Sequence, residues 1–316
     1  MSRRLIIILV AAALFFLIVS IYLNKIRAPK SFPFNTVYTI IDGSGLNSLA
    51  LDLNAKQIIR SPFWFKAFAV LLGGTKGVRA GDYNLTEKEN SLLLAKRISR
   101  GEFDLVPIKV TIPEGMSNKQ IAVLLEKNLH KFDKERFMEL AKDKEGYLFP
   151  DTYFFLPNQN PEIVVKTLAD NFAKKINEIS LEIAKFERSL SHIIIMASII
   201  EEEGKEKEGR EIISGILWKR LDRGMFLQVD APFRYSIGKH SYNLTSEDLK
   251  TDDPYNTYTR KGLPPTPITN PGLESILAAI HPTSTAYYFF LSEKNGTMHY
   301  AINYDGHLQN KELYLQ

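Results

Sequence analysis

The chain of 316 residues contains no cysteine. This absence excludes disulfide bonds, thiolate zinc sites and cysteine nucleophiles, and it is compatible with either an oxidising or a reducing compartment. No H-E-x-x-H motif or paired ligand spacing occurs among the histidines, and no G-x-S-x-G motif is present, so neither a metal site nor a serine triad has its usual cue. We therefore expect no metal and no cofactor. The six histidines are His130, His192, His240, His281, His299 and His307.

Positively charged residues only slightly outnumber negatively charged ones. The 40 Lys and Arg residues nearly balance the 36 Asp and Glu residues, which leaves a formal net charge of +4. The basic residues are scattered and form no stripe, so we expect no nucleic-acid partner. A hydrophobic fraction of 45% is ordinary for a globular chain, and the length suffices for two or three domains.

An uncharged stretch occupies residues 5–23, where only Ser20 and Tyr22 carry polar groups. As a helix it is long enough to cross the hydrocarbon core of a bilayer. A cleaved signal peptide typically has a shorter apolar region that ends in a small-x-small site, and none occurs here. We interpret residues 1–30 as an uncleaved single-pass anchor and tether. Positive charges on the two sides nearly balance, so they do not fix its orientation.

A short internal repeat, which we call the echo, follows the anchor. Residues 39–43 and 49–53 match residues 111–115 and 121–125 position for position. Each copy predicts a strand, a turn with an acidic residue and a glycine, and a helix.

Between the two copies the pattern predicts helices at 62–72 and 91–100 and a short strand at 80–85. Together these elements predict a small α+β module over residues 31–130, of the kind that carries LysM-like carbohydrate-binding units. A structural repeat without a ligand explains the same pattern, because a fold alone does not establish binding.

Residues 131–316 are expected to form the second, larger domain, also of mixed α+β class. Pro161 opens an amphipathic helix through about residue 179, a second helix follows through the 180s, and an apolar one runs from Ser191 into Glu201.

Glu201 is the candidate catalytic residue. The preceding helix is apolar nearly all round at residues 193–200, so it should be buried, and it leads directly into three glutamates at 201–203. Burial favours the protonated form of a carboxyl group, which a general acid requires. The small residues Ala197 and Ser198 share the helix face of Glu201 and leave room for a substrate. The alternative is that the three glutamates form a solvated helix end.

Candidate substrate-binding residues lie farther along the chain. Five prolines stiffen residues 253–272 into a loop that presents aromatic faces and polar tips suited to sugar rings. A purely structural linker is the alternative reading of this loop. The candidate sugar-binding residues in this loop and in the preceding extended segment are Gln228, Asp230, Tyr255, Asn256, Thr257 and Tyr258.

Several sequence blocks together resemble one known family, the YceG-like endolytic murein transglycosylases of the bacterial inner membrane. Their order and spacing agree over nearly the whole chain, including the anchor. The blocks are E-G-Y-L-F-P-D-T-Y at 145–153, A-S-I-I-E at 197–201, L-Q-V-D at 227–230, Y-N-T-Y at 255–258 with P-G at 271–272, and A-A-I-H-P at 278–282. One departure is A-P-F at 231–233, where the family commonly has P-T-V.

The resemblance implies that Glu201 is catalytic and cleaves the β-1,4 bond between N-acetylmuramic acid and N-acetylglucosamine within nascent glycan strands. The glutamate would protonate the leaving oxygen and then help the muramic 6-hydroxyl attack, which leaves a 1,6-anhydro end and terminates strand elongation. The resemblance also implies a globular part outside the cytoplasm, with glycan strands, the bilayer and peptidoglycan synthases as partners. A non-catalytic, membrane-anchored glycan-binding scaffold is the competing interpretation.

Overall fold

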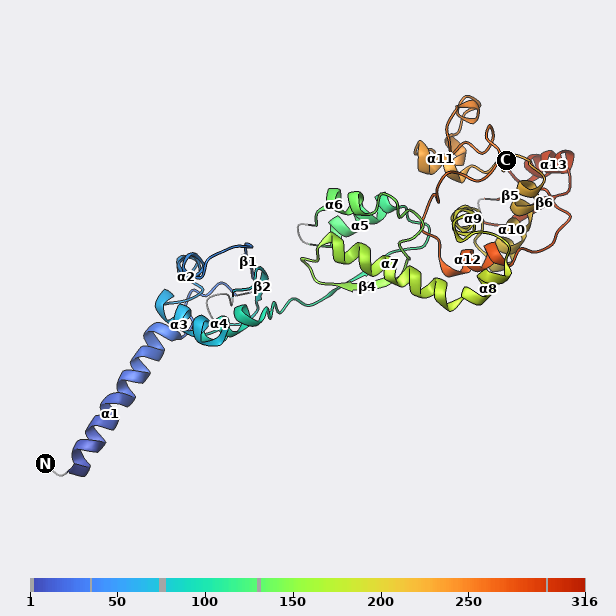
Figure 1. Ribbon diagram of the computed structural model, residues 1–316. Helices are drawn as coiled ribbons and strands as arrows, with labels where there is room; N and C mark the ends of the chain where they lie inside the picture. The colour runs from blue at the N-terminus through green and yellow to red at the C-terminus, as the bar shows by residue number, and fades with distance from the viewer. Residues whose placement is uncertain (1–2, 35, 74–77, 130–131, 294, 316) are drawn as a thin grey trace. The chain divides into compact units, whose positions relative to one another are not determined.

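The computed structural model describes residues 3–34, 36–73, 78–129, 132–293 and 295–315 (Figure 1). His130 and the loop residues 74–77 lie outside the described residues. The chain divides into two compact units. Unit 1 comprises residues 1–107 and 156–158, and unit 2 comprises residues 108–155 and 159–316.

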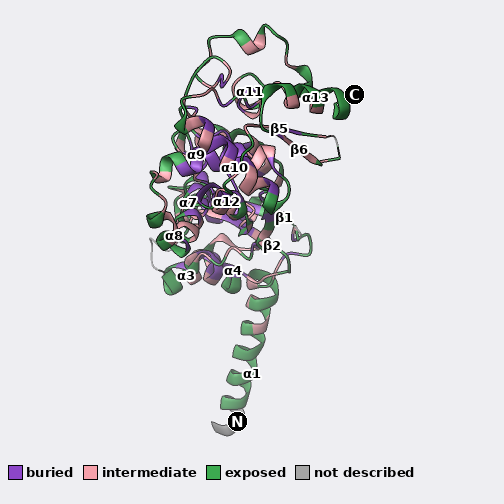
Figure 2. Cartoon of the chain, turned by 90° about the vertical axis from the view of Figure 1, so that its right-hand side faces the viewer, coloured by how far each residue is buried: buried purple, intermediate pink, exposed green. Residues whose placement is uncertain are grey.

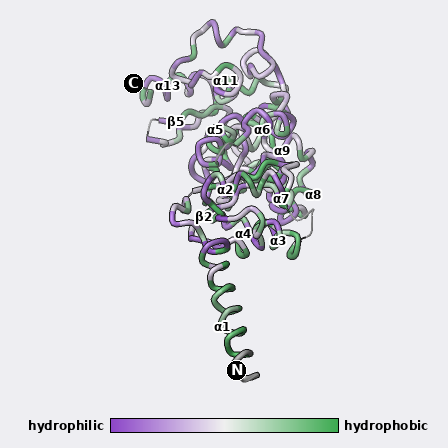
Figure 3. The backbone as a smooth tube through the Cα atoms, turned by 90° about the vertical axis from the view of Figure 1, so that its left-hand side faces the viewer, coloured by the Kyte–Doolittle hydropathy of each residue, from purple (hydrophilic) through white to green (hydrophobic). Residues whose placement is uncertain are grey.

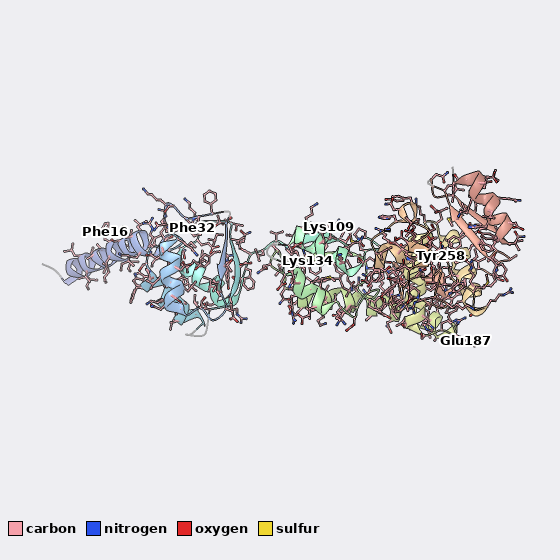
Figure 4. All side chains as sticks on the ribbon, turned by 90° about the horizontal axis from the view of Figure 1, so that it is seen from above. Phe16, Phe32, Lys109, Lys134, Glu187 and Tyr258 are labelled. Atoms are coloured by element: carbon pink, nitrogen blue, oxygen red, sulfur yellow. The ribbon has the colours of Figure 1, made fainter. Side chains whose placement is uncertain are left out.

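Unit 1 begins with the apolar helix α1 (Arg3–Ile21), which continues as one π-helical turn, η1 (Tyr22–Ile26). The stretch Ile7–Ile26 is long and apolar enough to cross a membrane, and none of it is buried within the protein. Phe16, for example, projects from α1 without a covering segment (Figure 4). An exposed apolar helix of this length requires an apolar environment, because water would solvate it poorly.

The rest of unit 1 is a small α+β fold around one core. Strands β1 (Thr36–Ile40) and β2 (Gly81–Leu85) pair antiparallel, with Tyr38 opposite Tyr83. Three helices share a core with this two-stranded sheet: α2 (Leu46–Ala55), α3 (Pro62–Gly73) and α4 (Ser91–Arg100). Asn90 caps α4 by accepting two backbone N–H bonds, and Gly101 ends it in the left-handed conformation.

Both copies of the echo form the predicted strand, turn and helix. The second copy consists of β3 (Ile108–Thr111) and α5 (Asn118–Asn128). Gly43 and Gly115 occupy matching turn positions with φ of +78° and +77°, which a side chain would strain. The two copies nevertheless belong to different units, because β3 pairs with β4 (Thr152–Phe155). The unit boundary therefore falls at 107/108 rather than at the expected 130/131.

Unit 2 is a mixed α+β fold rich in helices. Strands β5 (Phe289–Ser292) and β6 (Met298–Ala301) form a hairpin, and β3 and β4 form a separate two-stranded sheet. Its helices are α6 (Lys134–Leu140), α7 (Pro161–Glu178), α8 (Ser180–Lys185), α9 (Leu190–Glu203), α10 (Lys207–Asp222), α11 (Ala231–Ser236), α12 (Leu273–Ile280) and α13 (Tyr304–Tyr314), with short 3-10 turns η2 (Ser241–Asn243) and η3 (Asp248–Lys250), in addition to α5.

Helix α9 is the centre of the unit 2 core. All eight residues from 193 to 200 are buried, as the apolar pattern predicts, and α10 and α12 pack against them (Figure 2). Each fully buried isoleucine contributes about 1.5–3 kcal/mol relative to an exposed one. Ser189 caps the start of the helix, and Gly204 donates its N–H to the Ile200 carbonyl at the end. The glutamates at 201–203 are thus the last turn of a rigidly packed helix.

Helix α10 begins five residues before the start that the apolar pattern suggests. The pattern starts near Ile212, whereas the helix begins at Lys207. Its first turn contains Lys207 and Glu208, which are exposed and so do not contribute to the apolar stripe. This extra turn contains Arg210, whose guanidinium donates to the Glu201 carboxylate.

Candidate active site

The Glu201 carboxylate is bound by two donors from the protein. Oε2 accepts the backbone N–H of Gly272 at 2.8 Å, and Oε1 accepts a guanidinium N–H of Arg210 at 3.1 Å. The Glu201 side chain is only 6% exposed. Because α9 fixes the backbone and two donors fix the head group, the carboxylate is held in a single orientation.

Arg210 is as well held as its partner. Its side chain is 11% exposed, and its Nε donates to the carbonyl of Gly204 at 3.0 Å. A Cβ on Gly204 would lie 2.8 Å from Cγ of Arg210, so the chain turns between α9 and α10 at a residue without a side chain. The Arg210–Glu201 ion pair is therefore buried and tied to the backbone, unlike a solvated surface pair.

The hydrogen bonds of the buried residue Asn270 hold the loop that contains Gly272 next to Glu201. Asn270 exchanges backbone hydrogen bonds with residues 115 and 116, at 3.0 and 2.9 Å. Its side-chain Oδ1 accepts the N–H of Leu148, and its Nδ2 donates to the carbonyl of Met116, both at 2.9 Å. One buried side chain thus joins three loops that are distant in sequence, and these loops form the wall around Glu201.

Glu145, the carboxylate of the aromatic block at 145–153, belongs to the same network. Its Oε1 accepts the backbone N–H of Asn118 at 2.9 Å, and only 8% of the residue is exposed. Burial raises the pKa of Glu145 to about 7, although the Asn118 N–H acts in the opposite direction. Glu145 therefore helps to hold the loops that contain Asn118 and Asn270, and it has no direct contact with Glu201 in this network.

Glu114 brings a second carboxylate to the site, from the turn before α5. Burial raises its pKa, and the charge of Glu201 raises it further, whereas Arg210 lowers it. A Cβ on Gly272 would lie 1.9 Å from Oε1 of Glu114, so Gly272 leaves room for this carboxylate. Both carboxylates line a hollow of about 230 Å³, together with Gly115, Glu202, Glu203, Gly204, Lys205, Ser292, Glu293, Gly296 and Met298.

Glu202 lies at the junction with a second hollow, of about 410 Å³. Its Oε2 accepts a guanidinium N–H of Arg234 at 2.6 Å. Burial raises the pKa of Glu202, with the charge of Arg234 acting against it. The second hollow is also lined by Ser117, Lys119, Gln120, Ala231, Tyr235, Ser236, Ile237, Gly238, Ile268 and Thr269. Because both hollows share Glu202, they adjoin at the α9 terminus.

Glu203 faces a different environment. Burial raises its pKa to about 8, and the charge of Asp230 raises it, while the backbone N–H of Ala231 lowers it. Among the three consecutive glutamates, each therefore has its own partner: Arg210, Arg234 and the Asp230–Ala231 segment. This pattern is unlike a solvated helix end.

Stability measured against pH should report on Glu203. Its pKa is raised from 4.5 to about 8 in the folded state, so its contribution is fully present below 4.5 and is lost as the pH rises through about 8. We expect Glu203→Gln to abolish this part of the decline in the urea midpoint across that window. Glu208→Gln, an exposed position on α10, is the matched control. Identical pH profiles for the wild type and Glu203→Gln would contradict the assignment.

Tyr258 and Asp230 contact each other. The Tyr258 hydroxyl donates to Oδ1 of Asp230 at 2.6 Å, within the densely packed part of unit 2 (Figure 4). Burial raises the pKa of Tyr258, and the charge of Asp230 adds to the rise. Both residues are half-buried, so the structure joins them into one polar pair beside Glu203.

Gln228 and Tyr255 are both accessible to solvent, Gln228 more than Tyr255. Gln228 is exposed, and its left-handed backbone (φ +53°) is supported by an Arg220 donor to its side-chain oxygen at 2.7 Å. Tyr255 is half-buried against the ring of Tyr235, with centroids 5.1 Å apart, and its hydroxyl shares a 2.8 Å hydrogen bond with Thr266.

Asn256 and Thr257 lie inside the loop, which differs from the expectation that they face a sugar. Asn256 is 1% exposed, and its Nδ2 donates to the carbonyls of Leu249 and Thr251 at 3.1 and 2.7 Å. Thr257 is 3% exposed and donates its hydroxyl to the Val229 carbonyl at 2.8 Å. The geometry agrees with the alternative reading, in which polar side chains tie the loop to its own backbone.

Asn256→Ala is therefore expected to reduce stability rather than cleavage. The substitution removes three hydrogen bonds of a buried side chain, to the Leu249 and Thr251 carbonyls and from the Tyr258 N–H, each worth about 0.5–1.5 kcal/mol. Activity per folded molecule should stay near that of the wild type. Thermal melting and glycan cleavage should be measured on the same preparation. Lost activity at an unchanged melting temperature would return Asn256 to the substrate-binding residues.

Several residues of the site were not predicted from the sequence. Arg210 and Arg234 lie on helices without any motif that marks them. Glu114 belongs to the acidic turn of the echo, and Asn270 and Gly272 end the proline-rich loop, so a signal existed for these three. What the sequence does not reveal is that these segments meet at the end of α9.

The chain is similar to known proteins over most of its length. Residues 38–313 match the model of the YceG-like family. The chain is 31% identical over 303 residues to an endolytic murein transglycosylase of Bacillus subtilis, covering 87% of this chain and 84% of the relative. It is 27% identical to the endolytic murein transglycosylase of Streptococcus pneumoniae D39, of which it spans 57%. A crystal structure of a YceG-like protein from Listeria monocytogenes is 28% identical and superposes with a TM-score of 0.58 over 87% of this chain and 98% of that one.

Proposed function

Because the chain belongs to the YceG-like family, we propose that it cleaves the β-1,4 bond between N-acetylmuramic acid and N-acetylglucosamine within glycan strands, with Glu201 as its catalytic group. Two relatives named endolytic murein transglycosylase support the class of enzyme, a lytic transglycosylase that acts on peptidoglycan. The single observation that carries the residue assignment is the Glu201 carboxylate. It is buried, doubly held and set in the wall of a hollow.

The geometry of Glu201 suits a carboxyl group that first gives and later takes a proton. A carboxylate has about four lone-pair sites, and the protein donors Gly272 and Arg210 use one on each oxygen. One site on each oxygen remains for the substrate. Glu201 would protonate the glycosidic oxygen, then remove the proton of the muramic 6-hydroxyl as that oxygen attacks the anomeric carbon. No water enters the products, which end in a 1,6-anhydro ring.

A two-carboxylate hydrolase would need a second group to act as a nucleophile or to activate water. Asp230 is the carboxylate that the sequence suggests for that role. In the structure it accepts the Tyr258 hydroxyl and lies next to Glu203 rather than in the hollow lined by Glu114 and Glu201. These contacts argue against Asp230 in that role. Glu114 lines the same hollow as Glu201, so the identity of the product ends distinguishes the one-carboxylate route from a hydrolase that uses Glu114. Gln228, which is exposed, and Asp230, Tyr255 and Tyr258, which are half-buried, remain proposed substrate contacts.

The two adjoining hollows fit a polymer better than a small ligand. A strand lying across Glu202 would place successive sugars on both sides of the α9 terminus. We propose that α1 anchors the protein in the bacterial cytoplasmic membrane and that the globular part lies outside the cytoplasm, where nascent strands are made. Cleavage there would end strand elongation beside the synthases. Unit 1 is the proposed LysM-like module.

Product analysis tests this function directly. Full-length protein in detergent or lipid vesicles is incubated with uncrosslinked glycan strands, and the fragments are identified by mass spectrometry. We expect internal cleavage and 1,6-anhydro ends, each lighter than a hydrolysis product by one water. Reducing ends would indicate a hydrolase, and strand binding without fragments would indicate a glycan-binding scaffold.

A further inference from the structure

Helix α3 of unit 1 has an outer face that is wholly apolar and exposed. Phe63, Ala67, Val70 and Leu71 follow a spacing of i, i+4, i+7 and i+8, so they form one stripe along the helix. Phe63 is 69% exposed and Leu71 is 79% exposed. The opposite side of the helix is already in use, because Phe65 and Ala69 are buried in the core of the unit.

The neighbouring helix extends this surface. Leu92 and Leu93 in the first turn of α4 are 40% and 48% exposed, and α4 packs along α3. Contiguous apolar patches on a soluble surface mark sites that another apolar phase or partner covers. We call Phe63, Ala67, Val70, Leu71, Leu92 and Leu93 the α3–α4 patch.

The patch lies where the proposed membrane span leaves the bilayer. α3 contacts η1, the turn that ends the span at Ile26 (Figure 1). The residues after η1 are fastened to the unit: the guanidinium of Arg60 donates twice to the Ala28 carbonyl at 3.2 Å, and Phe32 is 3% exposed in the core. The expected free tether is therefore folded against unit 1, so the module cannot swing away from the end of α1.

The chemistry of α3 and α4 fits a lipid surface. Lys66, Lys96 and Arg100 are at least partly exposed, and the two helices contain no acidic residue, which complements anionic headgroups. The remaining basic residue, Arg97, is buried and paired with Glu89. Trp64 and its aromatic neighbours on α3 are of the type enriched at membrane–water interfaces. In the hydropathy view, α1 and α3 are both hydrophobic segments of unit 1, and α3 and α4 lie at the end from which α1 projects (Figures 2 and 3).

We propose that the α3–α4 patch inserts into the headgroup region of the bilayer and holds unit 1 flat against the membrane. The proposal rests on the membrane anchoring proposed above for α1. An interfacial helix buries its apolar face about 5–10 Å into the boundary between headgroups and acyl chains. Two attachments, one spanning and one interfacial, would fix the orientation of the module and hence the height at which the chain leaves it toward unit 2.

The absence of cysteine permits a direct test in the full-length chain. A single cysteine is introduced as Phe63→Cys or Leu71→Cys, labelled with an environment-sensitive fluorophore and reconstituted in vesicles that contain anionic lipid. The control is Ile41→Cys, at an apolar residue that is 74% exposed and follows β1, which lies farther from α1 than α3 does (Figures 1 and 2). Because all three side chains are exposed, their replacement should leave the core intact.

We expect lipid-attached quenchers to reduce the fluorescence at positions 63 and 71 severalfold more than at position 41, and aqueous iodide to show the reverse order. Equal quenching at all three positions, in protein that floats with the vesicles, would overturn the proposal and leave the anchor standing. Protein that does not float with vesicles would instead show that α1 is not inserted, and both proposals would fail together.

Discussion

Replacing Glu201 with glutamine is expected to reduce glycan cleavage by about 10²- to 10⁴-fold, the usual cost of removing a general acid. The amide cannot give and recover a proton. It also changes the two contacts of the head group, because its NH₂ must face either Gly272 N–H or Arg210, and both are donors. One donor is then left unpaired, which lowers the free energy of unfolding by about 1–3 kcal/mol. The variant should remain folded, with a lower melting temperature.

The matched control is Glu202→Gln, on the next residue of the same helix turn. Glu202 is paired with the half-exposed Arg234, whose side chain is 41% exposed. We expect a milder effect on the rate and a small one on melting. Initial rates of strand cleavage, normalised to the folded fraction, compare the two variants. Near-normal cleavage by Glu201→Gln would remove this residue from the chemistry and leave the glycan-binding scaffold as the better interpretation.

The position of Glu201 could be predicted from the sequence because one local rule decides it. A helix that is apolar on every side must be buried, and the first carboxylate after it lies at the edge of the core. Element types were also predictable, since caps such as Asn90 and Asp133 and the stop at Gly101 are local signals.

The remainder of the site depends on contacts between distant segments. Nothing local to Arg210 reveals that it meets Glu201, and the turn at Glu114 gives no sign that it lies against Gly272. The role of Asn256 also could not be predicted from the sequence. An asparagine in a stiff loop can bind a ligand or its own backbone, and only the fold decides between them. The boundary at 107/108 follows from the pairing of β3 with β4, which likewise is not encoded locally.

The ion pair between Arg210 and Glu201 leads to a second large expected effect. Arg210→Met keeps the apolar stem of the side chain but leaves a buried carboxylate without its cation. Removing one partner of a buried pair typically costs about 3–5 kcal/mol. Arg234→Met, which breaks the more exposed pair with Glu202, should cost no more than about 1 kcal/mol. Urea unfolding of the two variants measures both values.

A double-mutant cycle separates the charge from the packing of Arg210. In the Glu201→Gln background the neighbouring group is neutral, so Arg210→Met should remove only hydrogen bonds to neutral acceptors, such as the Gly204 carbonyl, and some contact area, about 1 kcal/mol. The difference between the two backgrounds is the coupling energy of the pair, expected at about 2–4 kcal/mol, toward the upper end of the values seen for contacting residues. If Arg210→Met costs the same with glutamate or glutamine at position 201, Arg210 serves the turn between α9 and α10 and not the carboxylate. A large coupling would establish that this arginine offsets the cost of placing the Glu201 charge at the end of a buried helix, where a general acid must lie to meet its substrate away from water.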